Sequence, residues 1–257
     1  MIKKRLAVFD VDHTILNGNT DIVVRDMLDK DLIPANIKLL YKKNDWIEYM
    51  QEIFKLLHKN NIKKDLILKT ISEIDELDGM KNCIKILYEN NFDTIIISDS
   101  NSQFINKWLE HNKLIGMIKI IYTNPAYFDE NDQLIIKPYH VQYECKISSV
   151  NLCKGQILID YINENKIDYK HIFYIGDGRN DICPILKLKQ NDYGCIRKNF
   201  SCDKEILNYS SEYLIDINCN LIKFTNGNDL IYNILKTFMD CKEIEKKYQL
   251  INKINEA

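Results

Sequence analysis

Leu6-Ala7-Val8-Phe9-Asp10-Val11-Asp12-His13-Thr14 is the most informative stretch of this sequence. Its apolar half, 6–9, predicts a short strand buried on both faces, because continuous apolar runs of this length are typical of parallel sheets. Asp10 and Asp12 follow directly, on the same side of an extended chain. The stretch therefore predicts a buried strand that presents two carboxylates at its carboxyl end.

The same pattern occurs twice more along the chain. Residues 94–97 lead into Ser98-Asp99, and residues 171–175 lead into Gly176-Asp177, each followed by a helical pattern. Strands that alternate with helices predict an α/β fold, with a parallel sheet flanked by helices. Ligands of such sheets lie beyond the carboxyl ends of the strands, so we expect the three polar ends to converge there.

The segment between Asp12 and Ser98 is too long for one crossover, since a βαβ unit needs roughly 30 residues in all. Apolar residues recur at helical spacing in 46–57 and again in 67–74. We therefore predict a small helical cap at 20–77, inserted into a catalytic core formed by 1–19 and 78–257. Farther along, residues 127–137 resemble a hairpin around an acidic turn.

The C-terminal segment from Lys242 carries Ile244, Tyr248 and Ile251 at helical spacing. It predicts a final helix that docks either on the body of the molecule or on another subunit. Both a monomer and a homodimer are compatible with this pattern.

The charge balance favours a small-molecule partner. With 35 Lys and Arg against 37 Asp and Glu, the net charge of −2 lacks the basic footprint of a nucleic-acid-binding protein. No apolar stretch is long enough to span a bilayer, and the run after the basic residues 1–5 meets Asp10 too soon for a signal-peptide core. We expect a cytoplasmic protein without a membrane partner.

The eight cysteines contain no Cys-x-x-Cys pair, which argues against a zinc ribbon and against a thioredoxin-type redox site. We interpret them as reduced and mostly buried thiols.

Two further elements carry candidate chemistry. Lys154 opens a helix in Asn151-Leu152-Cys153-Lys154-Gly155, and Gly176-Asp177-Gly178-Arg179-Asn180-Asp181 is an acidic turn whose glycines permit close approach to a ligand. Taken singly, the lysine is typical of a solvated side chain and the acids are typical of helix caps.

In this order, the four elements resemble the signature motifs of the haloacid dehalogenase (HAD) superfamily. Those motifs are Asp-x-Asp-x-Thr, a strand-terminal Ser or Thr, a Lys, and Gly-Asp-x-x-x-Asp. The resemblance covers most of 5–200 and implies a HAD-like core. It implies Asp10 as a nucleophile that becomes phosphorylated, Asp12 as general acid and base, Ser98 and Lys154 as phosphoryl ligands, and Asp177 and Asp181 in metal binding.

The negative charges at such a site require a cation to offset their repulsion. Two like charges 4 Å apart repel by about 4 kcal/mol at an effective dielectric of 20, and several carboxylates would face a phosphate dianion. Mg²⁺ prefers oxygen ligands, which Asp10, Asp177 and the backbone carbonyl of Asp12 can supply. We therefore expect Mg²⁺ as cofactor.

The strings Asn19-Thr20-Asp21, Ser98-Asp99-Ser100-Asn101 and 174–184 further resemble the family of phosphoethanolamine/phosphocholine and pyridoxal-phosphate phosphatases. Phosphoserine phosphatases are less similar, because they carry a Glu where this chain has Asn19. Asp21 and Asp99 would attract a cationic head group, with a helix cap and a loop hydrogen bond as the alternatives. Phosphoethanolamine, phosphocholine, pyridoxal phosphate and thiamine monophosphate all stay open as substrates.

Two other functions use the same motifs. A phosphotransferase or mutase would pass the phosphoryl group from Asp10 to a second substrate. A binding-only descendant would be expected to lose Asp10, Asp12 or the acids of the last motif, all of which are present.

Overall fold

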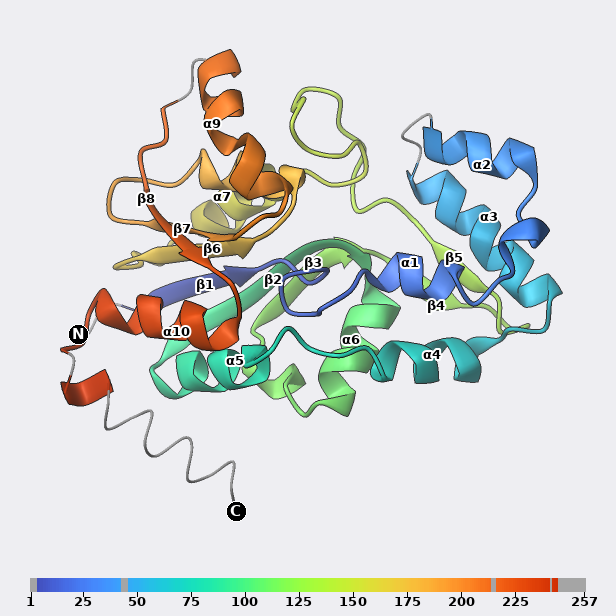
Figure 1. Ribbon diagram of the computed structural model, residues 1–257, viewed down its shortest axis with the longest axis horizontal. Coiled ribbons are helices and arrows are strands. Elements are labelled where there is room, and N and C mark those ends of the chain that lie inside the picture. The colour runs from blue at the N-terminus through green and yellow to red at the C-terminus, as the bar shows by residue number, and fades with distance from the viewer. Residues whose placement is uncertain (1–3, 43–45, 214–215, 241, 245–257) are drawn as a thin grey trace.

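The computed structural model describes residues 4–42, 46–213, 216–240 and 242–244 (Figure 1). Its centre is a six-stranded, fully parallel sheet with the strand order β3-β2-β1-β6-β7-β8. The strands are β1 (Arg5–Phe9), β2 (Phe92–Asn101), β3 (Ile120–Asn124), β6 (Ile172–Gly176), β7 (Tyr193–Arg197) and β8 (Asn220–Phe224). This is the α/β architecture that the strand-end pattern predicts.

The register of β1 brings the expected strand ends together. Phe9 pairs with Ile96 of β2 and with Ile175 of β6, so the chain that follows each strand emerges at the same edge of the sheet. The strand order also reverses here, because β2 and β6 flank β1 on opposite sides and their crossovers leave in opposite directions. Such a switch point opens a crevice between the diverging loops.

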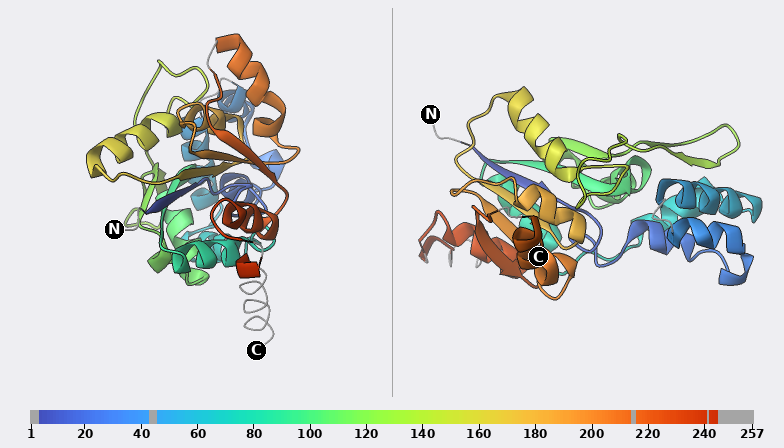
Figure 2. Two further views of the ribbon diagram at one scale, coloured as in Figure 1. Left: turned by 90° about the vertical axis from the view of Figure 1, so that its left-hand side faces the viewer. Right: turned by 90° about the horizontal axis from the view of Figure 1, so that it is seen from above.

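Both faces of the sheet are covered by helices (Figures 1 and 2). Ala7 and Phe9 face one apolar core, and Leu6 and Val8 face the other. The first core is built against α5 (Met80–Glu89), α6 (Ser102–His111) and α10 (Gly227–Lys236), and the second against α7 (Lys154–Asn165), α8 (Ile182–Ile185) and α9 (Ser201–Tyr213). Burial on both faces explains why β1 reads as a continuous apolar run.

The long insertion after β1 is helical. It contains α1 (Thr20–Arg25), α2 (Ala35–Lys42), α3 (Trp46–Lys59) and α4 (Lys64–Ser72), so helices lie at both places where the apolar spacing predicts them. Their buried side chains are continuous with the core on the Phe9 face of the sheet. The cap boundaries of 20–77 stay a prediction.

The insertion is closed at its base by paired backbone. Asn17 N–H donates to Asp75 O and Leu77 N–H donates to Ile15 O, each at 2.9 Å, around a bridge between Leu16 and Glu76. The chain therefore leaves and re-enters the core at one place.

A short antiparallel hairpin, β4 (Ala126–Phe128) and β5 (Leu134–Ile136), lies where the sequence places it. Gln51 of α3 binds its backbone on both sides: Nε2 donates to Leu134 O at 3.3 Å, and Oε1 accepts from Ile136 N–H at 3.0 Å. Figure 2 shows the hairpin strands lying along the insertion. The hairpin and the helical insertion thus pack together beyond the end of the sheet.

Ile244 is buried in the first core, as a helix docked on the body requires. Tyr248 and Ile251 lie outside the described residues. Among the described helices, none combines the length and the apolar character needed to cross a bilayer.

Candidate active site

Asp10 lies at the end of β1, in the crevice of the switch point, and its side chain is almost fully buried. Its Oδ1 accepts a hydrogen bond from Val11 N–H at 2.8 Å. Its Oδ2 lies 2.8 Å from Lys154 Nζ. One oxygen of the expected nucleophile is thus held by its own backbone, and the other faces a cation.

Lys154 is the first residue of α7, and the structure buries it completely. Its Nζ lies 2.8 Å from both Asp10 Oδ2 and Asp181 Oδ1. The solvated lysine that the isolated sequence suggests is therefore ruled out. The pKa of Lys154 is raised, because the attraction of Asp10 and Asp181 outweighs the desolvation that acts in the other direction. Lys154 therefore carries a positive charge where a phosphoryl group would bind.

Asp181 organises the turn after β6. Its Oδ2 accepts hydrogen bonds from Asp177 N–H at 3.0 Å and Gly178 N–H at 2.8 Å. Its Oδ1 accepts from Tyr174 Oη at 2.7 Å as well as from Lys154. A Cβ at Gly176 would collide with the Asp181 carboxyl group, so glycine is required there. Four donors thus saturate this carboxylate.

Asp177 is the third buried acid. Its Oδ1 accepts from Thr14 Oγ1 at 3.1 Å, which joins the end of β1 to the end of β6. Carboxylate oxygens of Asp10, Asp177 and Asp181 all lie within 4.8 Å of one another. This donor set consists of hard oxygens, as Mg²⁺ requires, and Lys154 forms ion pairs with two of its three acids.

Burial makes these carboxylates costly to ionise without a cation. It raises the pKa of Asp10 to about 7 against the opposing attraction of Lys154, and it raises the pKa of Asp177 to about 8 with a further contribution from the nearby Asp181. A divalent ion would favour the charged forms and lower both pKa values.

The Asp12 side chain is hydrogen-bonded to a residue outside the cluster of Asp10, Asp177 and Asp181. Its Oδ1 accepts from Thr20 N–H at 2.8 Å and its Oδ2 from Thr20 Oγ1 at 3.2 Å, and Thr20 Oγ1 lies 2.7 Å from Ser100 Oγ. Burial, reinforced by Asp21, raises the pKa of Asp12 well above its ordinary value. The shift favours the protonated carboxyl group, which is the form that a general acid needs.

Ser98 is buried, but it does not end its strand as the sequence suggests. β2 continues to Asn101, with a shift in its register against β3 between Ser98 and Asn101. Ser98 Oγ accepts from Ser100 N–H at 3.3 Å. The irregular strand end places Ser98, Asp99 and Ser100 beside the crevice, and Asn101 Oδ1 then caps α6.

Asp21 lies in the first turn of α1 and is buried rather than exposed at a rim. Its Oδ2 accepts from Trp46 Nε1 at 2.7 Å. Among the described residues, none donates a hydrogen bond of normal geometry to its Oδ1, although Asn101 lies nearby and favours the charged form. Burial raises the pKa of Asp21 to about 6, in spite of the Trp46 hydrogen bond that lowers it. The N-cap of α1 is Asn19, so the helix-cap alternative for Asp21 is wrong.

Asp99 is held by two donors on one oxygen. Its Oδ2 accepts from Ser149 Oγ at 2.8 Å and from Asn180 Nδ2 at 2.7 Å, which is the loop hydrogen bonding considered from sequence. Its Oδ1 is buried and accepts no hydrogen bond from the described residues. Asp99 also contributes repulsion to the raised pKa of Asp21, so the two acids share one region.

Several site residues were not singled out from sequence. Thr14 was present in the first motif, but nothing showed that it would bind Asp177. Tyr174 reads as an ordinary apolar strand residue, and Trp46 as part of an amphipathic stripe. His13 lies in a left-handed conformation with φ of 56°, and its carbonyl accepts from Arg197 Nη1, which agrees with a loop role.

Comparison with known proteins agrees with this geometry. The family model described as "Putative Phosphatase" matches residues 5–238. Pyridoxal phosphate phosphatase PHOSPHO2 of Bos taurus is 33% identical over 233 residues, covering 89% of this chain and 96% of the relative. The phosphoethanolamine/phosphocholine phosphatase of Gallus gallus is 29% identical over 202 residues, covering 77% and 75%.

The fold has solved counterparts. A phosphoserine phosphatase in apo form superposes with a TM-score of 0.58 at 17% identity, over 93% of this chain and 100% of that one. A structure described as a phospho-aspartyl intermediate analogue of phosphoserine phosphatase gives 0.57 at 19% identity, over 92% and 100%. At this identity the likeness concerns the fold. The chain therefore belongs to the family described as "Putative Phosphatase", its fold is HAD-like, and it is a hydrolase of phosphoric monoesters.

Proposed function

We propose that this chain is a Mg²⁺-dependent phosphatase that works through an aspartyl phosphate on Asp10 and acts on a small metabolite with a cationic group. The observation that carries the proposal is the position of Lys154, whose buried ammonium group lies 2.8 Å from Asp10 Oδ2 and 2.8 Å from Asp181 Oδ1. It places a fixed positive charge beside the nucleophile, where a phosphoryl group must arrive.

The donor set supports a division of labour at the metal. Asp10 and Asp177 each keep free acceptor capacity, and Asp12 would contribute its backbone carbonyl, because its carboxylate is bonded to Thr20. Asp181 is near enough, but it already accepts four hydrogen bonds, so its role is to hold Lys154 and the turn. When bound, Mg²⁺ supplies charge neutralisation for the phosphate and the acids.

The first chemical step forms the Asp10–phosphorus bond and breaks the bond from phosphorus to the leaving oxygen. Asp12, whose raised pKa favours the protonated form, gives its proton to that oxygen. Lys154 and the Ser98 hydroxyl donate to the remaining phosphoryl oxygens. In the second step Asp12 takes a proton from water as the water oxygen attacks phosphorus, and Asp10 is released.

The surroundings of Asp21 favour a cationic substrate. Asp21 Oδ1 and Asp99 Oδ1 are buried carboxylate oxygens that accept no hydrogen bond of normal geometry from the part of the chain that the structure describes. Trp46, which binds Asp21, packs at 5.7 Å against the rings of both Tyr41 and Tyr49. Carboxylates combined with aromatic faces suit ammonium groups. Phosphoethanolamine, phosphocholine, thiamine monophosphate and pyridoxal phosphate are therefore the compounds to test.

The decisive experiment measures phosphate release from these four esters and from neutral glycerol phosphate, with Mg²⁺ and with excess EDTA. We expect turnover only with Mg²⁺, inhibition by Ca²⁺ because its coordination is looser, and the highest kcat/KM on a cationic ester. Asp10→Asn should remove turnover of every ester. Full activity in that variant would refute the covalent route, and undiminished turnover in EDTA would refute the metal.

A further inference from the structure

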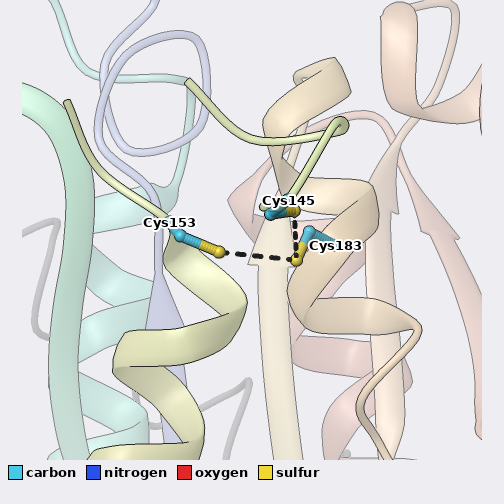
Figure 3. Close-up of side chains that lie close together, drawn as sticks. All are labelled: Cys145, Cys153 and Cys183. Carbon is cyan, nitrogen blue, oxygen red and sulfur yellow. Dashed lines mark hydrogen bonds between the residues drawn. The ribbon is translucent and has the colours of Figure 1, made fainter. Parts of the chain in front are cut away.

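Three cysteines, two from the segment before α7 and one from α8, lie close together (Figure 3). Cys145 lies in the loop between β5 and α7, Cys153 precedes α7, and Cys183 lies in α8. Cys183 Sγ is 3.4 Å from Cys145 Sγ and 3.8 Å from Cys153 Sγ. The three sulfurs lie within 4.8 Å of one another. They form a cluster, although no Cys-x-x-Cys pair occurs in the sequence.

The spacing of the sulfurs matches a metal-thiolate site. At a Zn–S distance of about 2.3 Å, two ligands of a tetrahedral ion lie about 3.8 Å apart. The sulfurs of a disulfide lie about 2.05 Å apart, and a disulfide would use only two of the three. We propose that Cys145, Cys153 and Cys183 bind a soft or borderline metal ion of the Zn²⁺ class through their thiolates, at a site separate from the carboxylates.

The positions of the ligands are fixed by their surroundings. Gln142 Oε1 accepts from Cys145 N–H at 2.8 Å, and Gln142 Nε2 donates to Cys145 O at 3.2 Å. Cys153 N–H donates to His140 Nε2 at 2.8 Å. A Cβ at Gly155 would lie 2.5 Å from Cys183 Sγ, so only glycine lets that sulfur pack against α7. Such supporting contacts are typical of preorganised metal sites.

One side of the cluster opens to a cavity of about 900 Å³. Cys145, Cys153 and Cys183 line it together with Lys146 and Lys187, whereas Asp10, Asp12, Asp177 and Asp181 do not. Three thiolates leave one position of a tetrahedral ion free for water or a small anion. Three thiolates with one divalent ion carry a net negative charge, and the lining of the same cavity includes two lysines.

Binding would join the loop at Cys145 to two segments that carry expected active-site residues. Cys153 is bonded to Lys154 along the chain, and Cys183 follows Asp181 closely in the turn from η3 (Arg179–Asp181) into α8. An ion on the three sulfurs would therefore tie the loop at Cys145 to the segments that position Lys154 and Asp181. Each thiol loses its proton to water on binding, so affinity for the metal should fall as the pH falls.

The test uses the full chain, reduced and stripped of metal, with excess Mg²⁺ present to occupy the oxygen site. Titration with Co²⁺ should produce the near-ultraviolet charge-transfer absorption of a cobalt thiolate, which carboxylate ligands do not give. Zn²⁺ should remove that absorption, with one tightly held zinc ion per chain by elemental analysis. A reduced chain that binds neither ion would overturn the proposal.

Matched variants locate the site. Cys145→Ser should weaken Zn²⁺ binding by about tenfold or more, since even changes outside the ligand shell cost 10–100-fold. Cys219→Ser removes a buried thiol whose Sγ contacts Ile185 O at 3.8 Å, and it should leave binding unchanged. Equal affinity in the two variants would count against the cluster.

A measurement on the unmodified chain does not depend on how the variants fold. Zn²⁺ should slow the alkylation of Cys145, the least buried of the three, as followed by peptide mass spectrometry. Identical labelling with and without Zn²⁺, or a Cys145–Cys183 disulfide that forms equally in its presence, would contradict a thiolate site. None of these readouts uses phosphatase activity, so their outcome is independent of the proposed function.

Discussion

The ammonium group of Lys154 lies 2.8 Å from Asp10 Oδ2, and both side chains are buried. This pair joins the first turn of α7 to the end of β1. In the proposed mechanism it positions charge for phosphoryl transfer, and it also neutralises acids that the fold has removed from water. We therefore expect activity and stability to depend on the same contact.

Replacing Lys154 by Met should therefore damage both properties. Breaking a buried ion pair from one side costs about 3–5 kcal/mol, because the partner is left as an uncompensated charge. We expect this loss in denaturant unfolding at pH 8 and a smaller one at pH 5, where Asp10 can take up a proton. Lys55→Met, which removes a surface pair with Glu52, is the control and should change little. Similar losses of unfolding free energy in both variants would show that the buried pair contributes no more to stability than the surface pair.

Asp12→Asn should separate the two chemical steps. The first step needs little protonation when the leaving group is a good one, such as an aryl oxide, but release from Asp10 needs a base to activate water. We expect a phosphorylated chain to accumulate, detectable as a mass increase on the peptide that contains Asp10. If no phosphoenzyme can be trapped from any ester, Asp12 does not have the divided role assigned to it.

Asp21→Asn and Asp99→Asn preserve shape but remove charge. We expect kcat/KM to fall by several-fold to tens of fold for phosphocholine or phosphoethanolamine, and less for a neutral aryl phosphate, since a desolvated ion pair is worth more than the roughly 0.2–1 kcal/mol of an exposed one. Asp99 is bonded to Asn180 in the catalytic turn, so Ser149→Ala is a useful control that removes only its other donor. Equal losses on cationic and neutral esters would assign the two acids a structural role.

The preference for cationic esters should depend on pH through Asp21. Its pKa is raised to about 6 by burial, so it is charged above that pH and neutral below it. The ratio of kcat/KM for a cationic ester to that for a neutral one should therefore fall as the pH drops through 6. Trp46→Phe removes the hydrogen bond that favours the charged form, so it should move this midpoint upward. A ratio that is flat with pH in both proteins would exclude Asp21 from head-group binding.

The strands that lead to Asp10, Ser98 and Asp177 could be predicted, because a strand buried on both faces has a continuous apolar sequence. Polar residues at the end of such a run are easy to recognise. β8 was not anticipated, since most of its residues are exposed or half-buried at the sheet edge and give no such contrast. The expected role of Lys154 as a phosphoryl ligand rests on a resemblance, and its burial could not be predicted, because a helix-opening lysine has no local mark of burial.

Contacts between distant segments were beyond the reach of the sequence. Trp46 of α3 donates a hydrogen bond to Asp21 of α1, and Tyr174 of β6 donates one to Asp181. Neither pairing follows from periodicity, which reports which face of an element is apolar but not which neighbour it meets. The cysteine cluster is the clearest case, since Cys145, Cys153 and Cys183 show no regular spacing.

The paired backbone at the base of the insertion, where Asn17 bonds to Asp75 and Leu77 to Ile15, has a consequence for protein engineering. Because the two ends of the insertion lie side by side, the insertion can be exchanged for the corresponding segment of a relative without a change in the strand pairing of the central sheet. The groups proposed to carry the chemistry, Asp10, Lys154 and Asp177, stay in the recipient, while Asp21 and Trp46 are transferred with the insertion. In a chimera joined at this base, we therefore expect the reaction chemistry of the recipient protein. Its substrate preference should come largely from the protein that donates the insertion.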